Sequence, residues 1–173
     1  MFNFKFIKMK KILFGLIAIV LFGSMSYGQK IIYSNCSLRT GDKIGIDDKG
    51  IYNISVDKEK LLEDFSIIAK ESGLDLKYNN VEILNVNPDK NLNYFGLYAH
   101  SGSGATTAIS LVLDNGVFKI DSNGGTISCS SVGCTGFGCT AYDTGTFWSC
   151  SACTQACSKV TTVVIKPKID WGN

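Results

Sequence analysis

Six of the seven cysteines lie close together, between residues 129 and 157. They follow the spacing C-x4-C-x4-C-x10-C-x2-C-x3-C, at Cys129, Cys134, Cys139, Cys150, Cys153 and Cys157. In an oxidising compartment an even set of cysteines forms structural disulfides, each of which stabilises a fold by about 2–4 kcal/mol. We therefore expect three disulfides in this segment. Six cysteines allow fifteen different pairings, and the sequence does not select among them.

The same cysteines allow two other kinds of chemistry. The segment Phe147-Trp-Ser-Cys-Ser-Ala-Cys153 resembles the aromatic-flanked CxxC of thioredoxin-like oxidoreductases. This resemblance implies thiol–disulfide exchange by Cys150 and Cys153, but no strand-to-helix pattern surrounds them and four further cysteines crowd them. Alternatively, the CxxC pair with Cys157 or Cys134 holds zinc or an iron–sulfur cluster, although only one CxxC is present. We expect neither a metal nor another cofactor.

The seventh cysteine, Cys36, stands alone and makes the total odd. Such a residue is a buried thiol, a link between two chains, or the partner of a cysteine in the cluster. The sequence leaves these three roles open, and we treat Cys36 as the unpaired candidate.

Four aromatic residues lie within the cysteine-rich segment, at Phe137, Tyr142, Phe147 and Trp148. Aromatic side chains held rigidly on loops are suited to contact with a protein or glycan partner. They are equally suited to capping the open face of a sheet. We regard them as the candidate binding residues.

His100 is the only histidine and is followed closely by Ser101 and Ser103 in a glycine-rich stretch. A serine hydrolase needs a base held opposite its serine and a third group that orients the base. Sequence neighbours on one loop do not provide that geometry, and the pattern G-x-S-x-G is absent. We expect His100 to be a strand-end residue, and we predict no catalytic residues and no enzyme activity.

Residues 1–28 contain the parts of a secretory signal peptide. Four lysines precede the apolar run 12–22, and the small residues Ser26 and Gly28 stand at positions −3 and −1 before Gln29. The apolar run is shorter than the roughly 20 residues that span a bilayer. The signal is similar to those of Bacteroidota secreted proteins that begin the mature chain at glutamine. We predict a secreted or periplasmic protein that contacts a membrane only through the cleaved signal peptide.

Removing this segment changes the charge of the protein. Four of the 17 basic residues and none of the 15 acidic residues lie in residues 1–28, so residues 29–173 carry a formal charge of −2. The sequence 29–173 contains no run of basic residues. Nucleic-acid binding is therefore disfavoured, because it relies on a concentrated positive surface.

The rest of the chain predicts an α+β fold. An amphipathic helix is expected over residues 58–72, with Asp57 as its N-cap and Gly73 as its stop. Its apolar residues recur at steps of three and four, at Leu61, Leu62, Phe65, Ile68 and Ala69. Strands are expected at residues 31–33, 44–46, 51–56, 74–78, 81–86, 94–99, 106–113, 117–120 and 160–165. Asn79-Asn80 is expected to turn, and Asn115-Gly116 is a hairpin turn.

These elements predict one helix packed on an antiparallel sheet of about five to seven strands, with a cysteine-rich, disulfide-stapled loop near the C-terminus. We divide the chain into a signal peptide (1–28), an α+β domain (29–121), a Cys/Gly/Ser/Thr-rich disulfide segment (122–159), and a final strand and tail (160–173). The predicted function is non-catalytic, a binding or structural role of the cystine-rich loop toward an unknown protein or glycan. The alternatives are a secreted inhibitor or toxin and a thiol–disulfide oxidoreductase using Cys150 and Cys153.

Overall fold

The computed structural model describes residues 32–86, 94–123, 125–130, 140–143, 148–151, 158–160 and 163–168. The chain divides into two units, Met1–Lys30 and Ile31–Asn173, and all the described residues belong to the second. The predicted signal peptide lies outside the described residues. No helix within the described ranges is long and apolar enough to cross a membrane.

The predicted helix is present as α2 (Lys58–Glu71). Asp57 caps it, since its carboxylate accepts hydrogen bonds from the amides of Glu59 and Lys60 at 2.9 and 3.3 Å. Ser72 is the C-cap, and Gly73 follows in the left-handed conformation with a φ of 83°. The buried face consists of Leu61, Asp64, Phe65, Ile68 and Ala69. Leu62, which the sequence pattern places on this face, is only half-buried. Asp64 is buried there instead, although the pattern predicts only apolar residues on this face.

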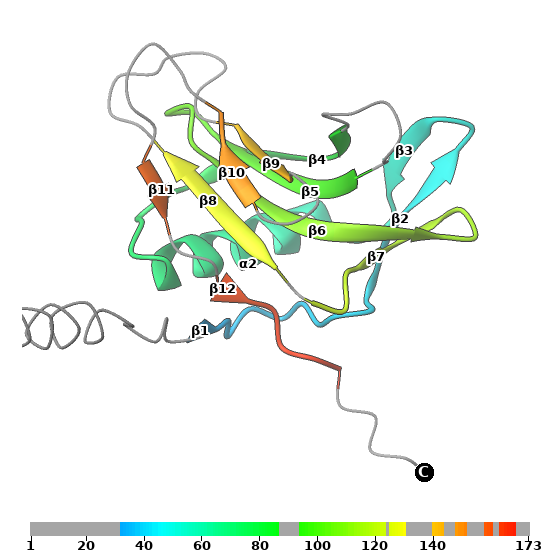
Figure 1. Cartoon of the computed structure of the whole chain (residues 1–173), viewed down its shortest axis with the longest axis horizontal. Helices are drawn as coiled ribbons and strands as arrows, with labels where there is room; N and C mark the ends of the chain where they lie inside the picture. Colours follow the sequence, from blue (N-terminus) through cyan, green and yellow to red (C-terminus); the bar gives the residue numbers. More distant parts are fainter. Residues whose placement is uncertain are drawn as a thin grey trace, which may run out of the picture. The chain divides into compact units, whose positions relative to one another are not determined.

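The helix packs on an antiparallel sheet (Figure 1). Its main strands are β2 (Lys43–Asp48), β3 (Ile51–Ile54), β4 (Tyr78–Val86), β5 (Tyr94–Ser101), β6 (Thr106–Asp114), β7 (Val117–Ile120) and β8 (Thr126–Ser130), with the short β11 (Ser158–Val160) beside β8. Strand β6 is central: β5 pairs along one side of it, while β8 and β7 share the other side. The predicted fold class is confirmed.

The sheet curls until β2 and β3 approach β4, which makes a nearly closed barrel. The approach depends on Gly45 in β2, because a Cβ at this position would lie 2.8 Å from Cδ1 of Ile83 and 2.3 Å from the carbonyl oxygen of Asn53. The ring of Tyr52 in β3 lies 5.6 Å from that of Phe95 and 5.3 Å from that of Phe118, in edge-to-face contacts that fill the curled end.

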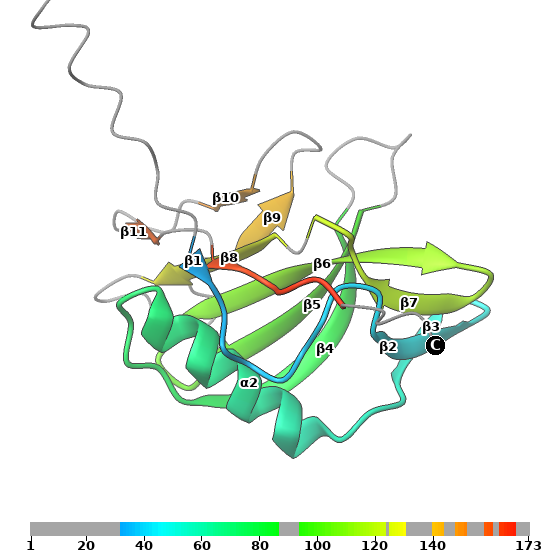
Figure 2. The ribbon, with the colours of Figure 1, turned by 90° about the horizontal axis from the view of Figure 1, so that it is seen from below.

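The two faces of the sheet are covered by different parts of the chain. One face carries the main core under α2, to which β4, β5, β6 and β7 contribute Ile83, Leu97, Ile109 and Phe118. The other face is covered by a hairpin of β9 (Ala141–Asp143) and β10 (Trp148–Cys150), on the side of the sheet opposite the helix (Figure 2). The cysteine-rich segment thus supplies the layer that covers the sheet on the face opposite the helix.

A short parallel pair joins the start and the end of the described chain. Strand β1 (Ile32–Tyr33) pairs with β12 (Val163–Val164), and β12 also bridges to Gly125 just before β8. The hydroxyl of Thr126 donates to the carbonyl of Val163 at 2.5 Å, which fixes β12 against the sheet.

Most of the predicted strands are confirmed, including the hairpins 43–54 and 106–120. Asn115 and Gly116 have φ values of 50° and 78°, as the predicted tight turn requires. The predicted turn at Asn79-Asn80 is wrong: β4 begins at Tyr78 and runs through both asparagines, with a register shift between Tyr78 and Asn80. Residues 74–77 precede this strand and form no part of it.

The final part of the chain also differs from its prediction. The sequence pattern places Thr126–Ser130 in the cysteine-rich segment, yet these residues form β8, which pairs with both β6 and β11. The predicted single strand 160–165 is replaced by β11 and β12, which belong to different sheets. The polar residues of β8 are tolerated inside the protein because the hydroxyls of Thr126 and Ser128 form hydrogen bonds there.

Candidate functional site

A disulfide between Cys129 and Cys150 ties the β9–β10 hairpin to the sheet. The bond has an S–S length of 2.04 Å, and the two Cα atoms are 5.8 Å apart. It joins β8 to β10 across 21 positions of sequence. This pair confirms that the cluster contains a structural disulfide. Cys134, Cys139, Cys153 and Cys157 lie outside the described residues.

The hairpin is also held by packing and hydrogen bonds. The second-face core comprises Tyr98, Ala108, Ile127, Cys129 and Ala141, all fully buried. Leu84 and Cys150 pack against it. The amide of Ala141 donates to the hydroxyl of Thr106 at 3.2 Å, and Ser151 donates its amide to the carbonyl of Thr140 at 2.8 Å. The hairpin is therefore a fixed layer on the sheet.

Two of the four candidate binding aromatics belong to this hairpin. In the β9–β10 register Tyr142 pairs with Ser149, and Trp148 pairs with Asp143. The structure thus brings these two backbone positions together next to the disulfide. Phe137 and Phe147 lie outside the described residues.

Cys150 is bonded to Cys129, so it carries no thiol in this structure. The CxxC reading of Cys150 and Cys153 requires the first cysteine as a free thiolate or as the partner of the second. The observed bond joins Cys150 to Cys129 and not to Cys153. Among the described residues, no group of three or more histidine, cysteine or acidic side chains is arranged to hold a metal ion.

Cys36 is a buried free thiol with no exposed surface. Burial raises the pKa of this thiol, and the negative charge of Asp64 raises it further, while a hydrogen bond with Ser34 offsets part of the rise. Its sulfur lies 4.0 Å from the carbonyl oxygen of Leu38. Of the three roles left open by the sequence, the structure selects the buried thiol, a poor nucleophile in this setting.

His100 lies in β5, near the end of the strand, as predicted. Its Nε2 is 2.9 Å from Oε1 of Glu82 on the neighbouring strand β4. The hydroxyl of Ser101 instead lies 2.8 Å from that of Ser103 and accepts the amide of Ala105 at 3.0 Å, which closes the turn before β6. The histidine and the serines therefore have separate partners, and they do not form the nucleophile–base pair of a hydrolase.

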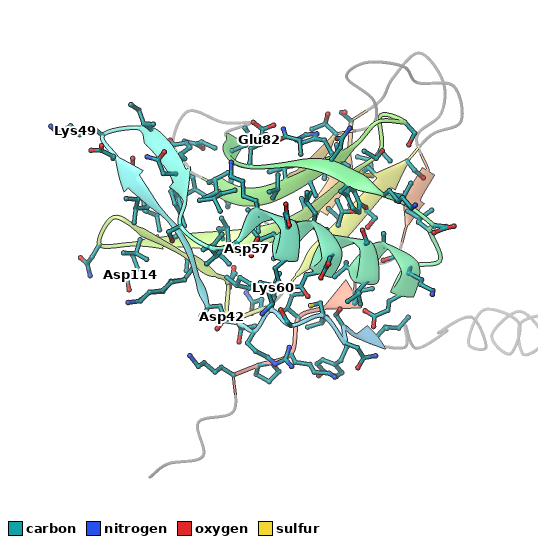
Figure 3. All side chains as sticks on the ribbon, turned by 180° about the vertical axis from the view of Figure 1, so that it is seen from behind. Asp42, Lys49, Asp57, Lys60, Glu82 and Asp114 are labelled. Carbon is teal, nitrogen blue, oxygen red and sulfur yellow. A yellow bond between two sulfur atoms is a disulfide. The ribbon has the colours of Figure 1, made fainter. Side chains whose placement is uncertain are left out.

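A cavity of about 240 Å³ opens at the N-terminal end of α2, where Asp42, Asp57 and Lys60 lie (Figure 3). Its acidic side chains already accept hydrogen bonds from the protein. Asp42 accepts the amide of Arg39, Asp57 caps the helix, and Asp64 accepts from Ser37. These carboxylates hold the local backbone in place.

Sequence reasoning missed the contact between the helix and the segment that follows β1. Glu71 accepts hydrogen bonds from the hydroxyl of Ser34 and the amide of Asn35, and Asp64 accepts from Ser37. A signal was present: Asp64 falls among the apolar residues of the helix stripe, and a buried carboxylate needs donors. The sequence alone does not predict which segment supplies those donors.

We compared the chain with protein-family models, curated proteins and solved structures. No protein-family model, no curated protein and no solved structure matches the chain.

Proposed function

We propose that this chain is an exported, non-catalytic binding protein that uses the cystine-anchored β9–β10 hairpin to contact a protein or glycan. The observation that carries the proposal is the disulfide between buried Cys129 on β8 and Cys150 on β10. A hairpin fixed in this way loses little conformational entropy when a partner binds, so more of the contact energy appears as affinity.

Export is supported by two independent features. The segment 1–28 has the composition of a signal peptide, and a structural disulfide persists mainly in oxidising compartments. Mass spectrometry of the protein recovered from the producing cell tests both at once. We expect an N-terminus at Gln29 and a linked Cys129–Cys150 peptide that separates on reduction. A cytoplasmic protein that retains residues 1–28 and has reduced cysteines would contradict the proposal.

The binding role is tested with biotin-labelled residues 29–173 applied to a glycan array and to the envelope fraction of the producing cell. We expect a saturable interaction that Trp148→Ala and Tyr142→Ala each weaken by about tenfold or more, as aromatic contact residues do. The matched control is Val112→Ala, which removes an exposed apolar side chain from β6.

Each variant must keep the thermal unfolding midpoint of the parent protein, so that lost binding is not lost folding. If binding persists unchanged in both aromatic variants, the hairpin is not the contact surface. If Val112→Ala weakens binding as much as the hairpin variants do, the contact surface extends elsewhere and the proposal is wrong.

A further inference from the structure

A groove of about 560 Å³ lies on a different part of the domain from the hairpin. It is lined by Tyr33, Arg39, Lys166, Pro167 and Lys168, which we call the basic groove. Its two walls are β1 with the chain that follows it, and the chain that follows β12. Hydrogen bonds from the amide of Ser34 to the carbonyl of Val164 and from Thr40 to Lys166, at 2.8 and 3.1 Å, join the walls.

The charge of the residues that line this groove is opposite in sign to the formal charge of residues 29–173 as a whole. Three of its lining residues are cations, and none of those in the described part of the chain is acidic. Residues 29–173 as a whole carry a formal charge of −2. Positive charge gathered in a concave site attracts anionic ligands and raises their local concentration. The volume is within the range of about 300–1,000 Å³ that is usual for small-molecule sites.

Arg39 is positioned for such a ligand by the backbone around it. Its Nη1 donates to the carbonyl oxygens of Cys36 and Leu38 at 2.7 and 2.6 Å, and its amide donates to Asp42 at 2.8 Å. The two bonds to carbonyl oxygens occupy only Nη1 of the guanidinium. Its Nε and Nη2 donate to no acceptor within the described residues, and this edge matches a planar carboxylate with two parallel hydrogen bonds.

The two lysines are also placed at the groove. Nζ of Lys166 donates to the side-chain oxygen of Asn35 at 2.8 Å, and Nζ of Lys168 lies 4.0 Å from a carboxylate oxygen of Asp42. Both lysines line the same groove as Arg39 and add to its attraction for an anion, although Asp42 offsets part of the charge of Lys168.

The remaining lining residues supply apolar surface. The Tyr33 side chain is 52% exposed, and Pro167 is exposed beside the cations. An exposed tyrosine has an apolar ring face and a polar edge, so it suits a ligand that is itself amphipathic. A uronic acid is such a ligand, because its ring has an apolar face and carries a carboxylate at its edge. A peptide rich in aspartate or glutamate brings carboxylates but little apolar surface to cover Tyr33.

We propose that the basic groove binds a uronic-acid-containing saccharide, with the guanidinium of Arg39 receiving the carboxylate and the ring of Tyr33 stacking on the sugar. This site goes beyond the proposed function. It shares no lining residue with the β9–β10 hairpin, so either proposal can fail without the other.

The test is isothermal titration of residues 29–173 with an oligogalacturonate at about 150 mM salt, where weak long-range attraction is largely screened. We expect saturable binding that Arg39→Gln and Tyr33→Ala each weaken by about tenfold or more. Arg39→Lys keeps the charge but lacks the fork, so it too should lose most of the affinity. The matched control is Lys58→Ala, which removes an exposed cation from the start of α2.

Three comparison ligands complete the design. A neutral oligosaccharide of the same length and a poly-glutamate peptide of the same charge should bind at least about tenfold more weakly than the oligogalacturonate. Equal binding of the peptide, or of dextran sulfate, a polyanionic saccharide that contains no uronic acid, would show a general anion-binding surface and overturn the proposal. Absence of oligogalacturonate binding would overturn it as well.

Arg39→Gln removes hydrogen bonds to two backbone carbonyls, so its folding needs a separate check. The double variant Lys166→Ala/Lys168→Ala leaves Arg39 and its backbone bonds in place and should also weaken binding. If the double variant and Tyr33→Ala both fold and bind the oligogalacturonate as the parent does, the groove is not the site, whatever Arg39→Gln shows.

Discussion

Ser37 donates two hydrogen bonds to the carboxylate of Asp64, from its amide to Oδ1 at 2.5 Å and from its hydroxyl to Oδ2 at 2.7 Å. Asp64 is only 3% exposed. Two helical turns further on, Glu71 accepts from Ser34 and Asn35 at 2.6 and 2.9 Å. The helix thus holds residues 34–38, which we call the strap, at two points over the core.

Removing the first of these points should loosen the strap. In Asp64→Ala the amide and hydroxyl of Ser37 lose a buried charged acceptor, so we expect a loss of about 2–3 kcal/mol in the free energy of unfolding. Hydrogen exchange at residues 34–38 should accelerate more than exchange in the sheet. The control is Glu63→Ala, an exposed neighbour on the same helix. Equal effects of the two variants would show that the Ser37 contact is not stabilising.

Cys36 lies within the strap, and its buried thiol should be inert in the folded protein. Burial and the nearby carboxylates raise its pKa, so it stays protonated and shielded at pH 8. We expect peptide-mapped alkylation to label Cys36 only after unfolding. In Asp64→Ala the labelling of Cys36 should become faster, because the strap opens more often. Rapid labelling of Cys36 in the native parent protein would contradict the buried position.

The Cys129–Cys150 disulfide should stabilise the domain by about 3 kcal/mol, the value expected for a closed loop of this size. We expect Cys129→Ala/Cys150→Ala to lower the free energy of unfolding in urea by this amount. Amide protection of residues 141–143 should decrease with it. The control is Ser149→Ala, which lies next to Cys150 in β10. If the double variant unfolds at the same urea concentration as the control, packing alone holds the hairpin.

The fold could be predicted where local chemistry and periodicity agree. Asp57 and Gly73 mark the ends of α2, and Asn115 with Gly116 marks the tightest hairpin. In these places the side chain or the backbone conformation of a single residue specifies the structure. Long-range packing is not needed to recognise them.

The errors have a common cause, which is that tertiary contacts override local patterns. Thr126 and Ser128 are residue types common in loops. In the structure they lie in a strand, where their hydroxyls form hydrogen bonds with Val163 and Thr107. Strand β4 continues through Asn79-Asn80 because the buried side chain of Tyr78 belongs to the core, and a register shift accommodates the extra residue. The pairing of Cys129 with Cys150 depends on the same long-range arrangement, since it can be predicted only once β8 is recognised as a strand of the main sheet.

Tyr78 carries a pH dependence that follows from its position. Its hydroxyl is hydrogen-bonded to Thr107, which in turn donates to Ser128 at 2.7 Å. Burial raises the pKa of Tyr78 from 10.0 to about 12, while the hydrogen bonds with Thr107 and Ser128 partly oppose the rise. Between these pH values the unfolded chain releases the tyrosine proton and the folded protein retains it. The free energy of unfolding should therefore fall as the pH rises from 10 to 12.

The expected fall due to Tyr78 is about 2–3 kcal/mol, since one pKa unit corresponds to about 1.4 kcal/mol. Urea unfolding measured from pH 8 to pH 12 gives this quantity as the difference between the parent and Tyr78→Phe. The variant should lose about 1 kcal/mol at pH 8, because one hydrogen bond is gone, and should then decline less steeply than the parent. Tyr33→Phe, at an exposed position, should decline as the parent does. Parallel curves for the parent and Tyr78→Phe would mean that Tyr78 ionises as easily in the folded protein as in the unfolded chain.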